Sequence, residues 1–249
     1  SYDSASVKQI LASYNTRYSY SQLSKLRSID NASPYTGNVY DDLRTIRVQS
    51  ESILSRKYLK CDISHPKAIK ITNQDLHRDV DIVTAGWYDN VNSIINDQNI
   101  TYRGIQVYDK VANNRCAADY PFLSIERINT KSVNTGGRLK RMIRFLKNIK
   151  ADSKQKIDLS SFDINAICYN IDIDAYKDLH YLYLVTIVFL QLHKIAYDES
   201  YANSITSVDG KEYIFRGNNK RREVATMLQN VSTIYSILKE QHLIISILR

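Results

Sequence analysis

Apolar residues recur every three or four positions over much of the chain, which is the spacing of amphipathic helices. The clearest early case is Asp41–Leu59, where Leu43, Ile46 and Leu54 share a face and two acidic residues open the first turn. The same spacing predicts helices later in the chain, over residues 138–150, 162–169, 179–197 and 221–248. The first 28 residues show a weaker, mixed pattern.

Alternation of polar and apolar residues is confined to a short region of the first half. In Arg78–Val83 it predicts a strand on which Asp79 and Asp81 point to the same face. A strand over Lys67–Thr72 precedes it, with a hairpin-like loop at residues 73–75, and Thr101–Val107 is predicted as a third. We therefore expect an α+β fold, with a mixed-sheet core over residues 1–120 and a mostly helical domain over residues 121–249.

The second half begins with a polar segment, residues 119–134, which we expect to be irregular. Thr135 is predicted to cap the helix that runs to about Lys150, and Ser160-Ser161 to cap the next helix. Residues 203–217 predict a short hairpin that turns at Asp209-Gly210. The second domain is thus expected to be helical apart from this hairpin.

Charge and cysteine content narrow the classes of partner and compartment. A formal net charge of +8 predicts partners that carry phosphate, such as nucleotides, nucleic acid or anionic lipid. Three cysteines without a CxxC spacing favour a reducing cytoplasm and argue against a zinc site. The longest apolar run, Tyr181–Leu192, is too short to span a bilayer, so no membrane partner is predicted.

The predicted helix after Thr135 is rich in cations, namely Arg138, Lys140, Arg141, Arg144, Lys147 and Lys150. Lys140, Arg144 and Lys147 recur at helical spacing, and no acidic residue lies between Arg138 and Lys150. A solvated surface explains such a run in the ordinary case. Because these cations lack acidic partners in the sequence, an anion that binds from outside explains this particular run better.

The stretch His77–Asn90 places Asp79, Asp81 and Asp89 around a short apolar run. Several carboxylates that converge inside a protein need a cation, and a divalent metal is the usual one. The alternative is a surface strand with an acidic, solvated face. The pattern by itself leaves both readings open.

Three short motifs together carry a resemblance to a known family: Val80–Ala85, Arg138–Lys147 and Ser160–Ala166. Their order and spacing, over about residues 40–170, resemble the polymerase-β-like nucleotidyltransferases. The nearest group is that of oligoadenylate synthase and cyclic-GMP-AMP synthase with its bacterial signalling relatives, some of which serve antiviral defence.

The resemblance implies a metal-dependent reaction on a nucleoside triphosphate, with Mg²⁺ or Mn²⁺ held by three carboxylates. It maps the third carboxylate onto Asp81, with Asp79 as a weaker candidate on the same face. Lys147 falls where the family places a lysine on the triphosphate, and Lys140 and Arg144 are its neighbours. Ser161 matches a position that contacts the nucleotide, although a plain helix cap explains it as well.

The chain departs from the family near its start. Such enzymes carry a Gly-Ser turn and then an Asp-x-Asp strand before the third carboxylate, and this chain shows neither in full. Asp3, in Ser1-Tyr2-Asp3, is the candidate for the second carboxylate and a metal ligand; a surface aspartate is the alternative. If the protein begins at Ser1, we expect little turnover, because one carboxylate cannot hold two metals.

Two functions follow from these motifs. The first is a nucleotidyltransferase that uses an ATP-like nucleoside triphosphate to make a nucleotide signal or to modify an RNA or protein acceptor. The second is a catalytically incomplete protein of the same fold that binds nucleotide, RNA or a partner protein through the basic helix. A simple RNA- or DNA-binding module is less well supported, because no stacking-aromatic pattern, helix-turn-helix or zinc finger stands out.

Overall fold

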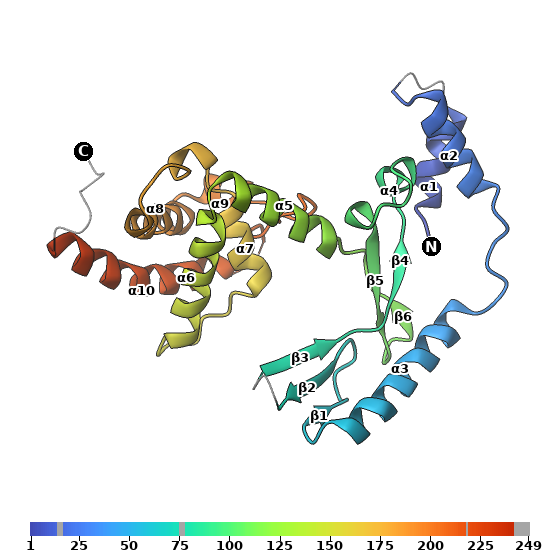
Figure 1. Cartoon of the computed structure of the whole chain (residues 1–249), viewed down its shortest axis with the longest axis horizontal. Helices are drawn as coiled ribbons and strands as arrows, with labels where there is room; N and C mark the ends of the chain where they lie inside the picture. The colour runs from blue at the N-terminus through green and yellow to red at the C-terminus, as the bar shows by residue number, and fades with distance from the viewer. Residues whose placement is uncertain (14–16, 75–77, 218, 242–249) are drawn as a thin grey trace. The chain divides into compact units, whose positions relative to one another are not determined.

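The computed structural model describes residues 1–13, 17–74, 78–217 and 219–241 of the chain. The chain divides into two compact units, Ser1–Leu123 and Ser124–Arg249, which are described separately below. The described strands all lie in the first unit, and the second consists of helices and turns (Figure 1). The predicted α+β class is therefore confirmed.

The first unit combines short helices with two small antiparallel sheets. Its helices are α1 (Ser4–Ala12), α2 (Tyr20–Asp30), α3 (Val39–Lys57), α4 (Val91–Ile95) and the 3-10 turn η1 (Ile100–Tyr102). One sheet has the order β1 (Cys61–Asp62), β2 (Ile69–Asn73) and β3 (Arg78–Ile82). The other has the order β4 (Ala85–Tyr88), β5 (Gly104–Asp109) and β6 (Asn114–Arg115).

Local chemistry explains why α3 forms where the sequence predicts it. The Asn38 side chain accepts hydrogen bonds from the backbone N–H groups of Tyr40 and Asp41, which begins the helix. Acidic residues occupy the first turn and basic residues the last, so both ends complement the helix dipole. Leu43 is buried on the inner face, whereas Ile46 is 52% exposed and does not belong to the core.

The strands predicted over Lys67–Thr72 and Arg78–Val83, with a hairpin-like loop between them, pair in the structure as β2 and β3. In the β2–β3 ladder Ile69 lies opposite Ile82, and Lys70 lies opposite Asp81. Ile69 is fully buried while Lys70 is exposed, so one face of this sheet packs inward and the other faces solvent. The end of the predicted loop between them, residue 75, lies outside the described residues.

The strand predicted over Thr101–Val107 begins later than expected. Residues 100–102 form η1, in which the Asn99 side chain accepts a hydrogen bond from the backbone N–H of Thr101, and β5 starts only at Gly104. Asparagine competes in this way with strand pairing because its short side chain reaches its own backbone. The strand exists, but a capped turn displaces its start.

Helix α5 (Pro121–Asn134) begins in the first unit and continues into the second. The rest of the second unit is built from α6 (Arg138–Asp152), α7 (Ser161–Tyr169), α8 (Leu184–Tyr197), α9 (Glu199–Ser204), α10 (Lys220–Glu240) and the 3-10 turns η2 (Ile173–Ala175) and η3 (Tyr181–Tyr183). Leu139, Leu146, Ile167, Leu192 and Val231 are fully buried in one apolar core that joins α6, α7, α8 and α10. The last seven residues of the helix predicted over 221–248 lie outside the described residues. No helix in the described ranges is long and apolar enough to cross a membrane.

Two predictions for the start of this unit are wrong. Residues 121–134 are not irregular but form α5, which has Pro121 at its first position, where a missing N–H costs nothing. Its serines, threonine and asparagines are poor helix formers, and packing of Ile128 against the core overrides that preference. Thr135 is not the N-cap residue of α6: its hydroxyl donates to the carbonyls of Lys131 and Ser132 at the end of α5, and it accepts one long hydrogen bond, at 3.4 Å, from the backbone N–H of Leu139 in the first turn of α6.

The N-cap of α6 is Gly137, at φ +82°, a backbone conformation that glycine adopts readily. The helix predicted to begin at residue 179 begins later in the structure, as α8 at Leu184, because the 3-10 turn η3 precedes it. The hairpin predicted over residues 203–217 is reduced to a single bridge between Thr206 and Tyr213 around a turn at Gly210. Helix α9 occupies the first two residues of that range.

Candidate functional site

Asp79 and Asp81 lie on the same solvent-facing side of β3, as predicted. Their partners across the ladder are Thr72 and Lys70, and the Thr72 hydroxyl donates to the Asp79 carboxylate at 2.8 Å. The Asp81 carboxylate has no hydrogen bond or ion pair among the described residues. We call this side of β2 and β3 the acidic face. Of its two carboxylates, Asp81 is the one whose oxygens are open to a ligand.

The acidic face borders a polar hollow of about 570 Å³ in the first unit. Its lining consists of Leu59, Lys60, Cys61, Asp62, Lys70, Ile71, Thr72, Asp79 and Asp81. Lys70 lies opposite both Asp62 on β1 and Asp81 on β3, so a cation stands between two carboxylates in one row across the sheet. The hollow is therefore bordered by side chains of both charges.

Asp3 lies elsewhere in the first unit. It is the N-cap of α1, where its carboxylate accepts hydrogen bonds from the backbone N–H of Ser6 at 3.2 Å and from the Ser6 hydroxyl at 2.7 Å. Its own N–H donates to the carbonyl of Asp89, next to the end of β4 (Figure 1). Asp81 belongs to the other sheet. The structure thus brings Asp79 and Asp81 together, but it does not place Asp3 with them.

The described carboxylates do not form a metal site by themselves. In the ranges that the structure describes, no three His, Cys, Asp or Glu side chains are grouped so that they could hold an ion. The oxygens of Asp79 and Asp81 are donors of the kind that Mg²⁺ and Mn²⁺ prefer. Because Thr72 already binds Asp79 and Lys70 faces Asp81, an ion at this position needs further ligands.

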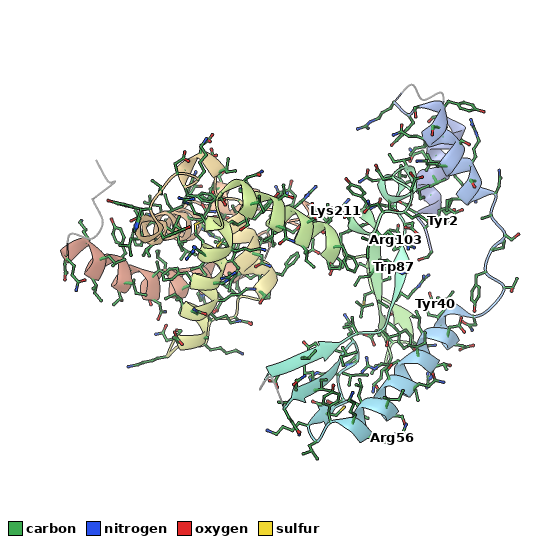
Figure 2. All side chains as sticks on the ribbon, in the orientation of Figure 1. Tyr2, Tyr40, Arg56, Trp87, Arg103 and Lys211 are labelled. Atoms are coloured by element: carbon green, nitrogen blue, oxygen red, sulfur yellow. The ribbon has the colours of Figure 1, made fainter. Side chains whose placement is uncertain are left out.

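Asp89, the last of the three aspartates in His77–Asn90, has a structural role. It is 4% exposed and receives a two-pronged contact from Arg103, whose Nε and Nη2 lie 2.8 and 2.9 Å from its two oxygens. Ser93 and Gln98 donate to the same carboxylate. Figure 2 shows Arg103 beside Trp87, and its guanidinium carbon lies 4.4 Å from the centre of that ring. All of the oxygens of Asp89 are therefore used within the fold.

The cations of α6 separate into two groups. Arg138 donates to the carbonyl of Leu179 at 2.7 Å and Lys150 to that of Leu159 at 2.6 Å, so these two hold neighbouring loops. Arg141 lies over the ring of Tyr181, with 3.9 Å between the guanidinium carbon and the ring centre. The sequence offers no signal for this contact with Tyr181, which is distant along the chain.

The remaining three cations, Lys140, Arg144 and Lys147, are here called the basic ridge. None of them has a hydrogen bond or ion pair within the described parts of the chain. Arg144 is exposed and the two lysines are partly exposed, while Leu139, Met142, Ile143 and Leu146 on the opposite side of α6 are buried. The ridge presents an uncompensated positive charge, which suits a phosphate-bearing ligand.

Lys147 lies near the buried thiol of Cys168 on α7. Burial raises the pKa of Cys168 to about 12, and the positive charge of Lys147 only partly opposes this effect. The thiol is therefore protonated at neutral pH and is a packing group, not a nucleophile.

The two serines at the start of α7 have different roles. Ser160 is the N-cap: its hydroxyl accepts from the backbone N–H of Asp163 and donates to the Asp163 carboxylate, which also accepts from the backbone N–H of Ser160. Asp163 is buried and receives a further hydrogen bond from Lys220 at 2.7 Å. Ser161 is exposed, and its hydroxyl has no hydrogen bond among the described residues. A cap role is thus taken by Ser160, and the Ser161 hydroxyl is open to a ligand.

The second unit matches the family model of the cGAS/DncV-like nucleotidyltransferase C-terminal helical domain over residues 126–236. Together with likeness over nearly the whole chain, this shows that the chain belongs to the cGAS/DncV-like nucleotidyltransferases. The predicted resemblance is therefore confirmed.

Individual relatives are named as synthases of one cyclic dinucleotide. A c-di-GMP synthase from Capnocytophaga granulosa is 54% identical over 80% of this chain and 57% of that protein. A c-di-GMP synthase from a Lachnospiraceae bacterium is 42% identical over 92% of this chain and 67% of that protein. The solved structure of a STING-associated CdnE c-di-GMP synthase from Flavobacteriaceae sp. superposes with a TM-score of 0.83 at 39% identity, over 96% of this chain and 68% of that one. This chain thus spans about three fifths to two thirds of its relatives' length.

Proposed function

We propose that the protein containing this chain is a nucleotidyltransferase that joins two guanosine nucleotides into c-di-GMP. The observation that carries the proposal is Asp81, whose carboxylate is exposed and unpaired at the position where the family resemblance places the third carboxylate. The names of the relatives support the choice of product. The basic ridge supports a triphosphate as the substrate.

In the proposed reaction a ribose hydroxyl of one GTP attacks the α-phosphorus of the other. A new oxygen–phosphorus bond forms, the bond to the leaving pyrophosphate breaks, and the hydroxyl proton passes to solvent or a base; a second such step closes the ring. Lys147, Lys140 and Arg144 bind the triphosphate and hold the leaving pyrophosphate, and Ser161 donates to the nucleotide. Mg²⁺ or Mn²⁺ is part of the proposal, with Asp81 as a ligand and Asp79 and Asp3 as weaker candidates.

The acceptor in this proposal is a second nucleotide. The relatives' names contain a cyclic dinucleotide and give no support to an RNA or protein acceptor. They also favour GTP over the ATP-like substrate expected from the sequence. A cytoplasmic location and a role in antiviral defence belong to the same proposal, and the STING-associated relative supports the second of these.

The test supplies the four nucleoside triphosphates singly and in pairs to the protein expressed from the whole reading frame that contains these residues. With Mg²⁺ or Mn²⁺ present, mass spectrometry should find c-di-GMP from GTP alone, and a chelator should abolish it. A mixed or adenine-only product would contradict the guanosine assignment, and no product at all would favour the catalytically incomplete binder. The 249-residue chain assayed in parallel tests the sequence-based prediction of little turnover, which robust product would contradict.

A further inference from the structure

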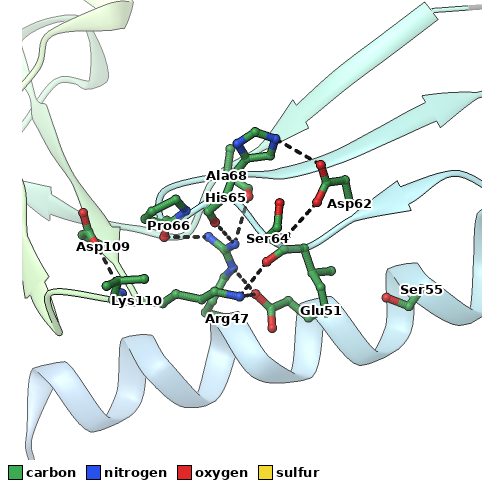
Figure 3. Close-up of polar contacts among 12 residues, drawn as sticks. Arg47, Glu51, Ser55, Asp62, Ser64, His65, Pro66, Ala68, Asp109 and Lys110 are labelled. Atoms are coloured by element: carbon green, nitrogen blue, oxygen red, sulfur yellow. Dashed lines mark hydrogen bonds and ion pairs between the residues drawn. The ribbon is translucent and has the colours of Figure 1, made fainter.

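A buried arginine that sequence reasoning missed lies beside the strands that carry Asp81. Arg47, on α3, is fully buried, and its guanidinium donates four hydrogen bonds (Figure 3). Three of them reach main-chain carbonyls of one loop: Nη2 to His65 at 2.8 Å and to Ala68 at 2.9 Å, and Nη1 to Pro66 at 3.3 Å. The fourth joins Nε to Glu51 at 2.8 Å. Arg47 therefore holds the loop that leads into β2.

Lys110, the residue after β5 in the sheet formed by β4, β5 and β6, also binds this loop. Its Nζ donates to Glu51 at 2.7 Å and to the carbonyl of Ile63 at 2.6 Å, and its N–H donates to the carbonyl of Pro66 (Figure 3). Burial by itself raises the pKa of Glu51, but hydrogen bonds from Lys110 and Arg47 outweigh it and hold the pKa below its ordinary value. We call Arg47, Glu51 and Lys110 the Arg47 network.

The path from this network to Asp81 is short. Ala68, whose carbonyl binds Arg47, directly precedes Ile69, and Ile69 pairs with Ile82 in the β2–β3 ladder. Two residues beyond Ile82, at the same end of β3, the carbonyl of Thr84 accepts a hydrogen bond from the N–H of Tyr108 on β5. The end of β3 next to Asp81 is thus held by two elements that the Arg47 network joins, the loop before β2 and the strand β5. Because ladder register is fixed, a shift of the loop moves the strand that carries Asp81.

We propose that Arg47 is a positioning residue for nucleotidyl transfer, which sets where the β2–β3 ladder presents the Asp81 carboxylate. The inference rests on the proposed function. Arginine offers five N–H donors in a rigid plane, and here four hydrogen bonds from it reach three carbonyls and a carboxylate. Lysine cannot reproduce this geometry. Burying a charge is costly even when it is paired, so simple packing would be served as well by an apolar side chain.

The experiment compares Arg47→Lys and Arg47→Met with the wild-type protein of the full reading frame. Arg56→Met is the matched control, because Arg56 lies on the same helix at an exposed position (Figure 2), and among the described residues its Nε bonds only the Ser52 carbonyl one turn back. Each protein is assayed well below its own melting temperature. The readouts are kcat and KM for GTP, with kcat expressed per GTP-binding site counted by equilibrium dialysis.

A positioning role predicts that kcat per site falls about tenfold or more in Arg47→Met, while KM for GTP stays within about twofold. Arg47→Lys should recover part of the loss, and Arg56→Met should match the wild type. A purely structural role reduces the number of binding sites and leaves kcat per site unchanged, and this result would overturn the inference. If Arg47→Met does not fold, Arg47→Lys and Glu51→Gln decide the question by the same readouts. A wild-type protein without product rejects the proposed function itself, whereas active wild type with unchanged variants rejects only the positioning role.

Discussion

The Arg47 network and the basic ridge use the same kinds of side chain in opposite ways. Arg47 is fully buried, and its guanidinium is engaged by one loop and one carboxylate. Lys140, Arg144 and Lys147 reach solvent and have no hydrogen-bond partner among the described residues. Charge that is fully paired inside a protein fixes geometry, and charge left unpaired on a surface is free for a ligand.

The comparison also shows which cations deserve a functional assignment. Counting basic residues on α6 gives a continuous charged helix, but Arg138 and Lys150 bind loop carbonyls and Arg141 stacks on Tyr181. Only the cations without such a partner are candidates for a triphosphate. The difference predicts separate losses: substitutions in the network should affect stability and kcat, and substitutions in the ridge should affect affinity.

Between these two regions, the largest expected effect comes from replacing Lys140, Arg144 and Lys147 together by alanine. Removing three cations from the proposed triphosphate site should raise KM for GTP about 100-fold, while the free energy of unfolding changes by no more than about 1 kcal/mol. Steady-state kinetics and denaturant unfolding measure the two quantities. Wild-type binding should also weaken with added salt, and that of the triple variant much less.

The matched control replaces Lys154, Lys156 and Lys239, three exposed lysines of the second unit, by alanine. This change removes the same net charge away from the ridge and should leave KM near the wild-type value. An equal rise of KM in both triple variants would show that overall charge, and not the ridge, attracts the nucleotide.

A smaller effect is expected when Glu51 of the network is replaced by glutamine. Arg47 and Lys110 then lose their charged partner, and the free energy of unfolding at neutral pH should fall by about 1 to 3 kcal/mol. Because the folded-state pKa of Glu51 lies below its ordinary value of 4.5, its contribution is present above that pH and is lost as pH falls through the folded-state pKa. Denaturant unfolding between pH 3 and pH 7 should therefore show a shallower acid decline in Glu51→Gln than in wild type. An identical decline in both proteins would show that ionised Glu51 does not contribute to the free energy of unfolding.

The smallest expected effects are those of replacing Ser160 and Ser161, and they distinguish the roles of these two adjacent serines. Ser160→Ala removes the α7 cap and should cost about 1 kcal/mol of stability with little change in KM. Ser161→Ala removes an unbonded hydroxyl and should raise KM for GTP about fivefold, the value of one hydrogen bond, without loss of stability. Thermal unfolding measures the stability of the two variants, and steady-state kinetics measures their KM for GTP. A stability loss in Ser161→Ala with unchanged KM would return Ser161 to a capping role.

Local sequence patterns correctly predicted the helices and strands whose structure depends mainly on their own side chains. The alternation in Arg78–Val83 put Asp79 and Asp81 on one face, and the helical spacing on α6 separated buried from charged positions. The prediction failed where distant residues decide: α5 forms in a polar segment because its few apolar side chains, such as Ile128, pack against a core contributed by other helices.

The residues of the candidate site show the same distinction between local pattern and distant contact. Short motifs pointed to Asp81, Lys147 and Ser161, and these three side chains have no hydrogen-bond partner among the residues that the structure describes. No motif pointed to Arg47 or Arg103, because their partners lie far along the chain: Arg47 binds Ala68, and Arg103 binds Asp89 across a turn and a short helix. Sequence spacing does not record such contacts, since they depend on how the elements pack.

The central claim is that Asp81, and not its neighbour Asp79, carries the chemistry of the acidic face. The most direct measurement is the rate of c-di-GMP formation from labelled GTP by wild type, Asp81→Asn and Asp79→Asn, with the melting temperature of each protein as a control for folding. We predict that Asp81→Asn loses activity about 1,000-fold or more while Asp79→Asn stays within about tenfold of wild type. Asp81→Asn that remains active and folded would contradict the account.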